Sequence, residues 1–187
     1  MREHGRSAPT PGQTVGPFFH YALPYDDGPR LAPAGAPDTI RLHGTVYDGA
    51  GAPVPDALLE VRQADTSGRV PATEGSLRRD GRFTGWGRAA TDRAGRYAFT
   101  TVEPAPVRDG AAAYFAVTVF ARGLLDRVFT RIYVPGRGLE DDPLLGALPA
   151  DRRGTLIAMR DSDGALHHDI RLQGEGETVF LAFPGHE

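Results

Sequence analysis

Short segments in which apolar and polar residues alternate, each closed by a turn, constrain the fold of this chain more than any other feature. In residues 39–47 the even-numbered positions are apolar or glycine, and the odd-numbered positions are polar or aromatic. The turn at Asp48–Gly51 follows, residues 58–63 alternate again, and residues 91–104 repeat a turn and a strand before Pro104 ends the ladder. A period of two is typical of half-buried β-strands, so the chain is predicted to be a β-protein.

The remaining segments extend this prediction to a two-sheet sandwich. With 24 glycines and 16 prolines among 187 residues, the composition disfavours a helical bundle and suits short strands joined by turns. One short helix is expected near residues 143–148, because Asp142 suits an N-cap and Pro143 suits the first helical position. Residues 64–90 show no sustained period and are interpreted as a long loop away from the sandwich. Further strands are predicted at residues 114–121, 128–134, 155–160, 169–173 and 178–183, which completes an all-β fold of two packed sheets with long loops and little helix.

Two regions are predicted along the chain, an N-terminal extended arm at residues 1–38 and a β-sandwich domain at residues 39–187. The arm is dense in proline and glycine, but it also carries aromatic residues between Phe18 and Tyr25. A disordered tail is usually poorer in aromatic residues. We therefore expect the arm to be ordered by packing these rings against its own sandwich or against another subunit, with a flexible leader as the alternative for residues 1–9.

Charge and composition exclude several classes of function. The net charge is −3, and the 21 cationic residues, all arginine, are scattered along the chain, so a nucleic-acid partner is not expected. The absence of cysteine excludes a disulfide framework and a thiolate metal site. The sequence has no stretch approaching the ~20 consecutive apolar residues that span a bilayer, and its N-terminus lacks the apolar run of a secretion signal. We expect a soluble, cytoplasmic protein without a membrane partner.

Three segments point to a known family. They read TPGQTVGPFF (Thr10–Phe19), FARGLLDRVFTRIYV (Phe120–Val134) and DIRLQGEGETVFLAF (Asp169–Phe183). With these segments the chain resembles the protocatechuate 3,4-dioxygenases, an intradiol ring-cleaving family, over nearly its whole length. The resemblance implies a β-sandwich and, in the active beta subunits of the family, a ferric ion held by two tyrosines and two histidines. Tyrosinate suits this ion because a hard, anionic oxygen stabilises iron in the ferric state.

The positions that match the four iron ligands carry other residues here. In active subunits one tyrosine follows a proline-containing turn, and Val107 stands at that position in this chain. Two histidines separated by one residue correspond to Tyr114 and Ala116. The second tyrosine corresponds to a position near Gly75, in a loop that contains no tyrosine. The resemblance is therefore to the family's alpha subunits, which bind no iron, and it implies Fe(III) on a partner beta subunit.

Two other candidates for metal binding are weaker. Tyr114 alone is more often a packed aromatic residue than a ligand. His167 and His168 are adjacent, and adjacent residues of a strand point to opposite faces, so the pair could not reach one ion from a regular strand. We interpret the two histidines as the exposed start of a strand and expect no metal on this chain.

Some residues of the matching segments could still shape a partner's pocket. The resemblance implies that Thr14, Gly16 and Pro17 lie close to the substrate pocket formed with the iron-bearing subunit. Glycine permits close backbone approach and proline fixes the chain direction, although Gly16 and Pro17 could also form a simple turn. Arg131 matches a family arginine near the binding region of the aromatic acid, and a guanidinium binds carboxylate through a planar fork. The alternative for Arg131 is a solvated arginine on an alternating strand.

The function implied by the resemblance is that of a non-iron-binding alpha subunit without catalytic residues of its own. With an iron-bearing beta subunit, the aromatic substrate and O2, it would cleave 3,4-dihydroxybenzoate to 3-carboxy-cis,cis-muconate, in aromatic catabolism by the beta-ketoadipate pathway. The alternative from the strand pattern is a stand-alone, transthyretin-like β-sandwich that binds without catalysis. An independent hydrolase is not supported, since the chain has neither a Gly-x-Ser-x-Gly motif nor a cysteine nucleophile.

Overall fold

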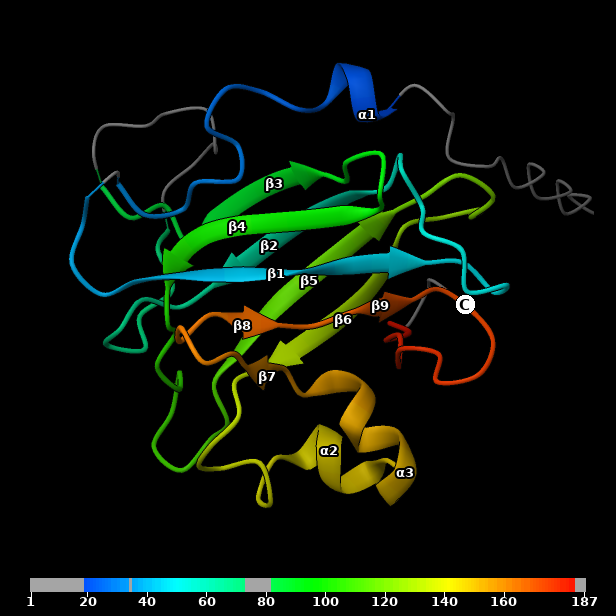
Figure 1. Cartoon of the computed structure of the whole chain (residues 1–187). Helices are drawn as coiled ribbons and strands as arrows, with labels where there is room; N and C mark the ends of the chain where they lie inside the picture. Colours follow the sequence, from blue (N-terminus) through cyan, green and yellow to red (C-terminus); the bar gives the residue numbers. More distant parts are fainter. Residues whose placement is uncertain (1–18, 34, 73–81, 184–187) are drawn as a thin grey trace, which may run out of the picture.

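The chain folds into a sandwich of two β-sheets with a few short helices outside the sheets (Figure 1). The computed structural model describes residues 19–33, 35–72 and 82–183. The elements in these ranges are α1 (Phe19–Ala22), β1 (Thr39–Tyr47), β2 (Leu58–Gln63), β3 (Trp86–Ala90), β4 (Arg96–Val102), β5 (Tyr114–Phe120), β6 (Val128–Tyr133), α2 (Pro143–Ala147), α3 (Ala150–Arg153), the 3-10 turn η1 (Gly154–Leu156), β7 (Met159–Arg160), β8 (Leu166–His167) and β9 (Ile170–Arg171). The prediction of an all-β, two-sheet sandwich with little helix is confirmed.

The strand order brings the two ends of the sandwich sequence together. One sheet has the order β4-β1-β8-β7, with β9 also paired to β1, and the other has the order β3-β2-β5-β6. In the second sheet every neighbouring pair is antiparallel. Its register places Ala116 of β5 opposite Arg62 of β2 on one side and opposite Arg131 of β6 on the other. Directly opposed residues share a face of a sheet, so these three side chains stand in one row.

The main core lies between the sheets, and the alternation of the strands supplies it. Leu42 and Phe99 of the first sheet and Val61, Phe115 and Ile132 of the second sheet are buried in one cluster. Burial of each such side chain stabilises the fold by ~1.5–3 kcal/mol. This packing fixes which face of each strand points inward. The residues between them in β2, β5 and β6 are thereby directed to the outer face of the second sheet.

A smaller core holds the helical segment against β6. Leu145 of α2 packs there beside Tyr133. The carboxylate of Asp142 accepts hydrogen bonds from the backbone N–H groups of Leu144 at 2.9 Å and Leu145 at 3.1 Å, and Pro143 occupies the first turn. The prediction of a short helix capped by Asp142 is confirmed.

The segment before β1 packs against the sandwich of its own chain. Leu31 is fully buried in the main core, and its backbone N–H donates to the carbonyl of Thr100 at 2.8 Å. The ring of Tyr25 stacks on Trp86 of β3 with the ring centroids 6.1 Å apart. Tyr25, one of the aromatic residues of the arm, therefore packs against the sandwich of its own chain. The division of the chain at residue 38 stays a prediction, and residues 1–18 of the arm lie outside the described residues.

One strand lies where the sequence pattern predicts a loop. β3 is part of the second sheet and pairs with β2, so the interpretation of residues 64–90 as a loop throughout is wrong. Its inward-facing residues are Gly87 and Ala89, which have low β-propensity and give no alternation of hydrophobicity. A Cβ at Gly87 would lie 2.4 Å from Cδ1 of Leu31, so the close approach of the arm requires glycine there.

The C-terminal strands are shorter than the sequence pattern predicts. Within residues 155–160, a 3-10 turn precedes the two-residue strand β7, and within residues 169–173 only β9 is extended in a ladder. Residues 178–183 form no strand but one isolated bridge, between Leu181 and Phe129. β8 has two residues and was not expected. These segments follow β1 and β6 closely enough for isolated hydrogen bonds, but they are too short to show a period of two.

Candidate functional site

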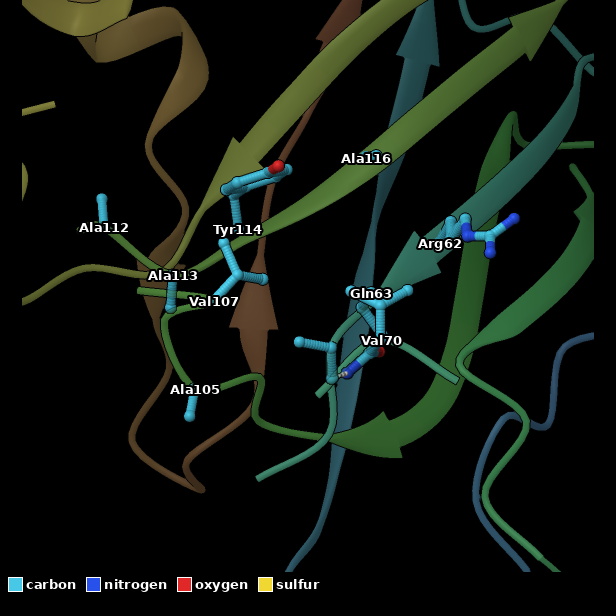
Figure 2. Close-up of a pocket in the computed structure, with 10 residues that line it drawn as sticks. Arg62, Gln63, Val70, Ala105, Val107, Ala112, Ala113, Tyr114 and Ala116 are labelled. Atoms are coloured by element: carbon cyan, nitrogen blue, oxygen red, sulfur yellow. Dashed lines mark hydrogen bonds between the residues drawn. The ribbon is translucent and has the colours of Figure 1, made fainter. Parts of the chain in front are cut away.

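A cavity of about 210 Å³ opens at the end of β2 and the start of β5, the two central strands of the second sheet (Figure 2). Arg62 and Ala116, which face away from the main core, contribute to it. Its walls come from three separate parts of the chain: the end of β2 with Val70 after it, the segment after β4, and the start of β5. Figure 2 shows Val107 next to Tyr114, Val70 beside Gln63, and Arg62 farther along β2. Residues that bear on its chemistry are Arg62, Val70, Ala105, Val107, Tyr114 and Ala116.

Three positions that the family resemblance matches to iron ligands meet at this cavity. Val107, Tyr114 and Ala116 all contribute to its wall. Tyr114 and Ala116 lie on β5, and Val107 lies in the segment between β4 and β5. The fourth matched position, near Gly75, lies outside the described residues. The fold thus gathers the positions expected of a metal site, while the side chains at two of the three carry no donor atom.

The side chains at these positions do not fit a ferric ion. Valine and alanine offer no oxygen or nitrogen, which leaves the phenol of Tyr114 as one donor where the family uses four. The guanidinium of Arg131 lies 4.1 Å from the centroid of the Tyr114 ring, so a second cation beside that ring would be repelled. Among the described residues, no group of three or more histidine, cysteine, aspartate or glutamate side chains is arranged to hold a metal ion.

Arg131 is held in a network and is not simply solvated. One of its N–H groups donates to the hydroxyl of Tyr133 at 3.0 Å, and that hydroxyl donates to Asp142 at 2.9 Å. Partial burial acts to lower the pKa of Arg131, but the hydrogen bond to Tyr133 and the charge of Asp142 outweigh it and raise the pKa overall. Burial raises the pKa of Tyr133 to about 12. Arg131 is therefore a permanent cation with a fixed orientation above Tyr114.

Arg62 differs from Arg131 in having no fixed partner among the described residues. Its side chain is exposed, and it makes no hydrogen bond or ion pair with any residue in the part of the chain that the structure describes. The neighbouring Gln63 is buried, and its amide is fully used: it donates to the carbonyls of Ala64 and Val102 and accepts from Thr101. Of the polar groups at the cavity, Arg62 is thus available for an external anion.

The adjacent histidines His167 and His168 lie at the first sheet, next to β1. His43 and His167 stack with ring centroids 5.1 Å apart. Their Nε2 atoms lie 2.9 Å from a carboxylate oxygen of Asp161 and 3.1 Å from one of Asp169, respectively. His168 points the other way and is 5% exposed. The prediction that both histidines form an exposed strand start is wrong for His168, because this residue sits between β8 and β9, where its backbone N–H donates to the carbonyl of His43.

Of the residues predicted to shape a pocket, Arg131 lies in the described part of the chain. Thr14, Gly16 and Pro17 lie outside it, so their predicted role stays a prediction. Sequence reasoning missed Arg62 and Val70. The alternation of β2 places Arg62 on the outer face, but its place beside Ala116 depends on the register between β2 and β5, which a single sequence does not reveal.

Comparisons with known proteins identify the family. A family model described as "Dioxygenase" matches residues 14–174. The sequence is 39% identical to the protocatechuate 3,4-dioxygenase alpha chain of Burkholderia cepacia, covering 92% of this chain and 96% of that protein. The chain belongs to the intradiol dioxygenase family. This membership is supported over the alternative of a stand-alone transthyretin-like module.

Other members of the intradiol dioxygenase family are also similar in sequence to this chain. The identity is 37% with the protocatechuate 3,4-dioxygenase alpha chain of Pseudomonas putida, covering 93% of this chain and 96% of the relative. With the beta chain from Burkholderia cepacia it is 32%, covering 75% of this chain and 67% of that protein. These homologues are subunits of an oxidoreductase. The family is iron-dependent in general. The protocatechuate 3,4-dioxygenase relatives are named as alpha chains or beta chains.

Solved structures of intradiol dioxygenases share the fold. The dioxygenase domain of a carbohydrate-binding fusion protein from Streptomyces sp. SirexAA-E superimposes with a TM-score of 0.61 at 24% identity, covering 89% of this chain and 99% of that one. Catechol 1,2-dioxygenase from Acinetobacter sp. ADP1 gives a TM-score of 0.58 at 21% identity, covering 82% of this chain and 60% of that one. At these identities the likeness shows the fold alone. Within the described residues, no helix is long and apolar enough to cross a bilayer.

Proposed function

We propose that this chain is the iron-free alpha subunit of a protocatechuate 3,4-dioxygenase and pairs with a beta subunit that carries Fe(III). The observation that carries the proposal is the cavity lined by Val107, Tyr114 and Ala116, which offers a ferric ion a single phenol oxygen. The chain's near full-length similarity to two alpha chains supports the same assignment. The assembled enzyme would use O2 to cleave 3,4-dihydroxybenzoate to 3-carboxy-cis,cis-muconate.

The contribution of this chain is binding and orientation of substrate beside its partner's metal. We assign Thr14, Gly16 and Pro17 to the wall of the shared pocket, and Arg131 to the carboxylate of the substrate. One N–H of Arg131 is engaged by Tyr133, and a bidentate pair with a carboxylate needs two of the others. The iron, when bound to the partner, supplies the ferric centre at which the catechol oxygens and the ring react. The complex is expected in the cytoplasm.

The test compares the chain expressed alone with the chain coexpressed with a family beta subunit. Alone, it should be colourless, contain less than stoichiometric iron by elemental analysis, and leave 3,4-dihydroxybenzoate intact. Coexpression should give a stable hetero-oligomer with the red colour of tyrosinate-to-iron charge transfer and ring-cleaving activity. Stoichiometric iron or ring cleavage in the isolated chain would contradict the assignment.

A further inference from the structure

The arm crosses the edge of the second sheet at β3 and contacts both faces of that sheet. Tyr25 stacks on Trp86, which lies on the outer face, whereas Leu31 is buried in the main core. Between these two contacts, the carbonyl of Gly28 accepts a hydrogen bond from the backbone N–H of Arg88 at 2.9 Å. Backbone hydrogen bonds therefore fasten the arm to β3 at residue 28.

Before Gly28, the side chain of Arg88 holds the arm. Its Nη1 donates a hydrogen bond to the carbonyl of Leu23 at 2.7 Å. Its Cζ lies 5.1 Å from the centroid of the Trp86 ring and 5.9 Å from that of the Tyr25 ring. Arg88 thus contacts two residues of the arm, one through a hydrogen bond and one through a cation–π contact.

Glu60 fixes the orientation of the Arg88 guanidinium. It stands directly opposite Arg88 in the register of β2 and β3, and its Oε1 accepts hydrogen bonds from Nε at 2.9 Å and from Nη2. The two side chains are 20% and 19% exposed, so solvent screens this pair less than a pair at the surface. With Nε and Nη2 bonded to Glu60, Nη1 is directed to Leu23. Lysine could not make these contacts together, because its ammonium is a point charge and not a planar fork.

We infer that Arg88 is a positioning residue for the reaction, because it fixes the arm at Leu23 and so limits where the preceding residues can reach. This inference rests on the proposed function, which assigns residues of the arm up to Pro17 to the shared pocket. Pro17 is six residues before Leu23 and eleven before Gly28, which β3 holds without the Arg88 side chain. Six residues span at most about 20 Å, and eleven span almost twice that distance.

The length of this tether sets the size of the expected effect. The effective concentration of a tethered group falls roughly as the −3/2 power of the tether length. A tether that grows from six to eleven residues therefore lowers it about two- to threefold, and KM for 3,4-dihydroxybenzoate should rise by the same factor. The kcat should change little, since the saturated pocket beside the partner's iron is the same.

The first test follows the arm by backbone hydrogen exchange in the full chain purified without a partner. The N–H of Gly28 donates to the carbonyl of Tyr25 at 3.0 Å, so exchange in this segment reports release of the arm. Arg88→Lys keeps a charge beside Glu60, so it should fold while residues 21–28 exchange about tenfold faster, because the bond to Leu23 is lost. Exchange in β5 should not change.

Two more variants accompany Arg88→Lys. Arg88→Gln should release the arm to a similar extent, because it removes the fork and the charge together. Arg96→Gln, which replaces an exposed arginine on β4 of the first sheet, is the matched control and should leave exchange in the arm unchanged.

The second test measures steady-state kinetics of the same variants in the complex with a beta subunit. KM should rise about two- to threefold in both Arg88 variants and stay constant in Arg96→Gln. A merely structural role of Arg88 would reduce the amount of complex without raising KM. If the unmodified complex leaves 3,4-dihydroxybenzoate intact, the proposed function is wrong, and this outcome is distinct from the exchange result. The inference about Arg88 is overturned if neither Arg88 variant speeds exchange in the arm, or if KM of an active complex is unchanged in both.

Discussion

The buried imidazole of His168 makes the stability of this chain depend on pH in a way that can be isolated. Burial lowers the pKa of His168 from 6.5 to about 4 in the folded chain, against smaller opposing effects from the backbone of Ile157 and from Asp169. Its Nε2 has no hydrogen-bond partner among the described residues. In the unfolded chain the imidazole is solvated and takes its ordinary pKa.

The sign and the magnitude follow from proton linkage. Because the folded pKa lies below the unfolded one, the unfolded chain binds more protons between the two values, so stability is complete above about pH 6.5 and falls as the pH is lowered toward 4. At about 1.4 kcal/mol per pH unit, the full difference is about 3 kcal/mol. Between pH 7 and pH 5 the loss attributable to His168 is about 2 kcal/mol.

Urea unfolding of the full chain at pH 7 and pH 5 measures this loss. The free energy of unfolding should fall by about 2 kcal/mol more in the unmodified chain than in His168→Leu, whatever the absolute stability of the variant, because the leucine cannot be protonated. His167→Gln, at the neighbouring half-buried position, is the control and should retain most of the pH dependence. If His168→Leu loses as much stability as the unmodified chain over this range, the argument from burial is wrong.

Three further predictions test the packing and the proposed role of the site. Gly44→Ala should destabilise the chain by about 3 kcal/mol or more in urea unfolding, because its Cβ would lie only 1.8 Å from the carbonyl oxygen of His168, whereas Gly146→Ala meets no atom within 4 Å and should not destabilise. Asp142→Ala should lower stability by about 1–2 kcal/mol through loss of the α2 cap, and Asp142→Asn by less. In the assembled enzyme, Arg131→Lys should raise KM for 3,4-dihydroxybenzoate by about tenfold with kcat little changed, since a bidentate contact becomes a point charge; an unchanged KM would remove Arg131 from the pocket.

The elements that could be predicted from sequence are those whose side chains alternate over five residues or more and whose ends are marked. β1, β2, β5 and β6 carry that pattern, and α2 carries its cap at Asp142. β3 could not be predicted because Gly87 is set by the approach of Leu31 from a distant segment. The two-residue strands β7, β8 and β9 are defined by pairing with one another and with β1, so their existence depends on tertiary contacts that no short window contains.

The candidate site divides in the same way. The positions Val107, Tyr114 and Ala116 could be named from a family resemblance, and the fold brings all three to one cavity. Val70 and Arg62, which line the same cavity, could not be named, because Val70 reaches it through the path of a loop and Arg62 through strand register. Alternation assigns a face to a residue, whereas register assigns its neighbours.

The row formed by Arg62, Ala116 and Arg131 concerns which charge takes the place of a metal ion at this part of the second sheet. A bound cation is often the largest local charge in a site and attracts anionic ligands. Here, two arginines flank a residue without a side-chain donor, one on each of the two strands that neighbour β5, and each of these strands lies about 5 Å from β5. This part of the outer face of the second sheet is therefore positive without a metal, and a site whose residues offer no set of iron ligands can still prefer anions. On this argument, replacing Arg62 and Arg131 together by glutamine should remove any preference of this face for small anions, whereas adding Fe(III) should not restore it.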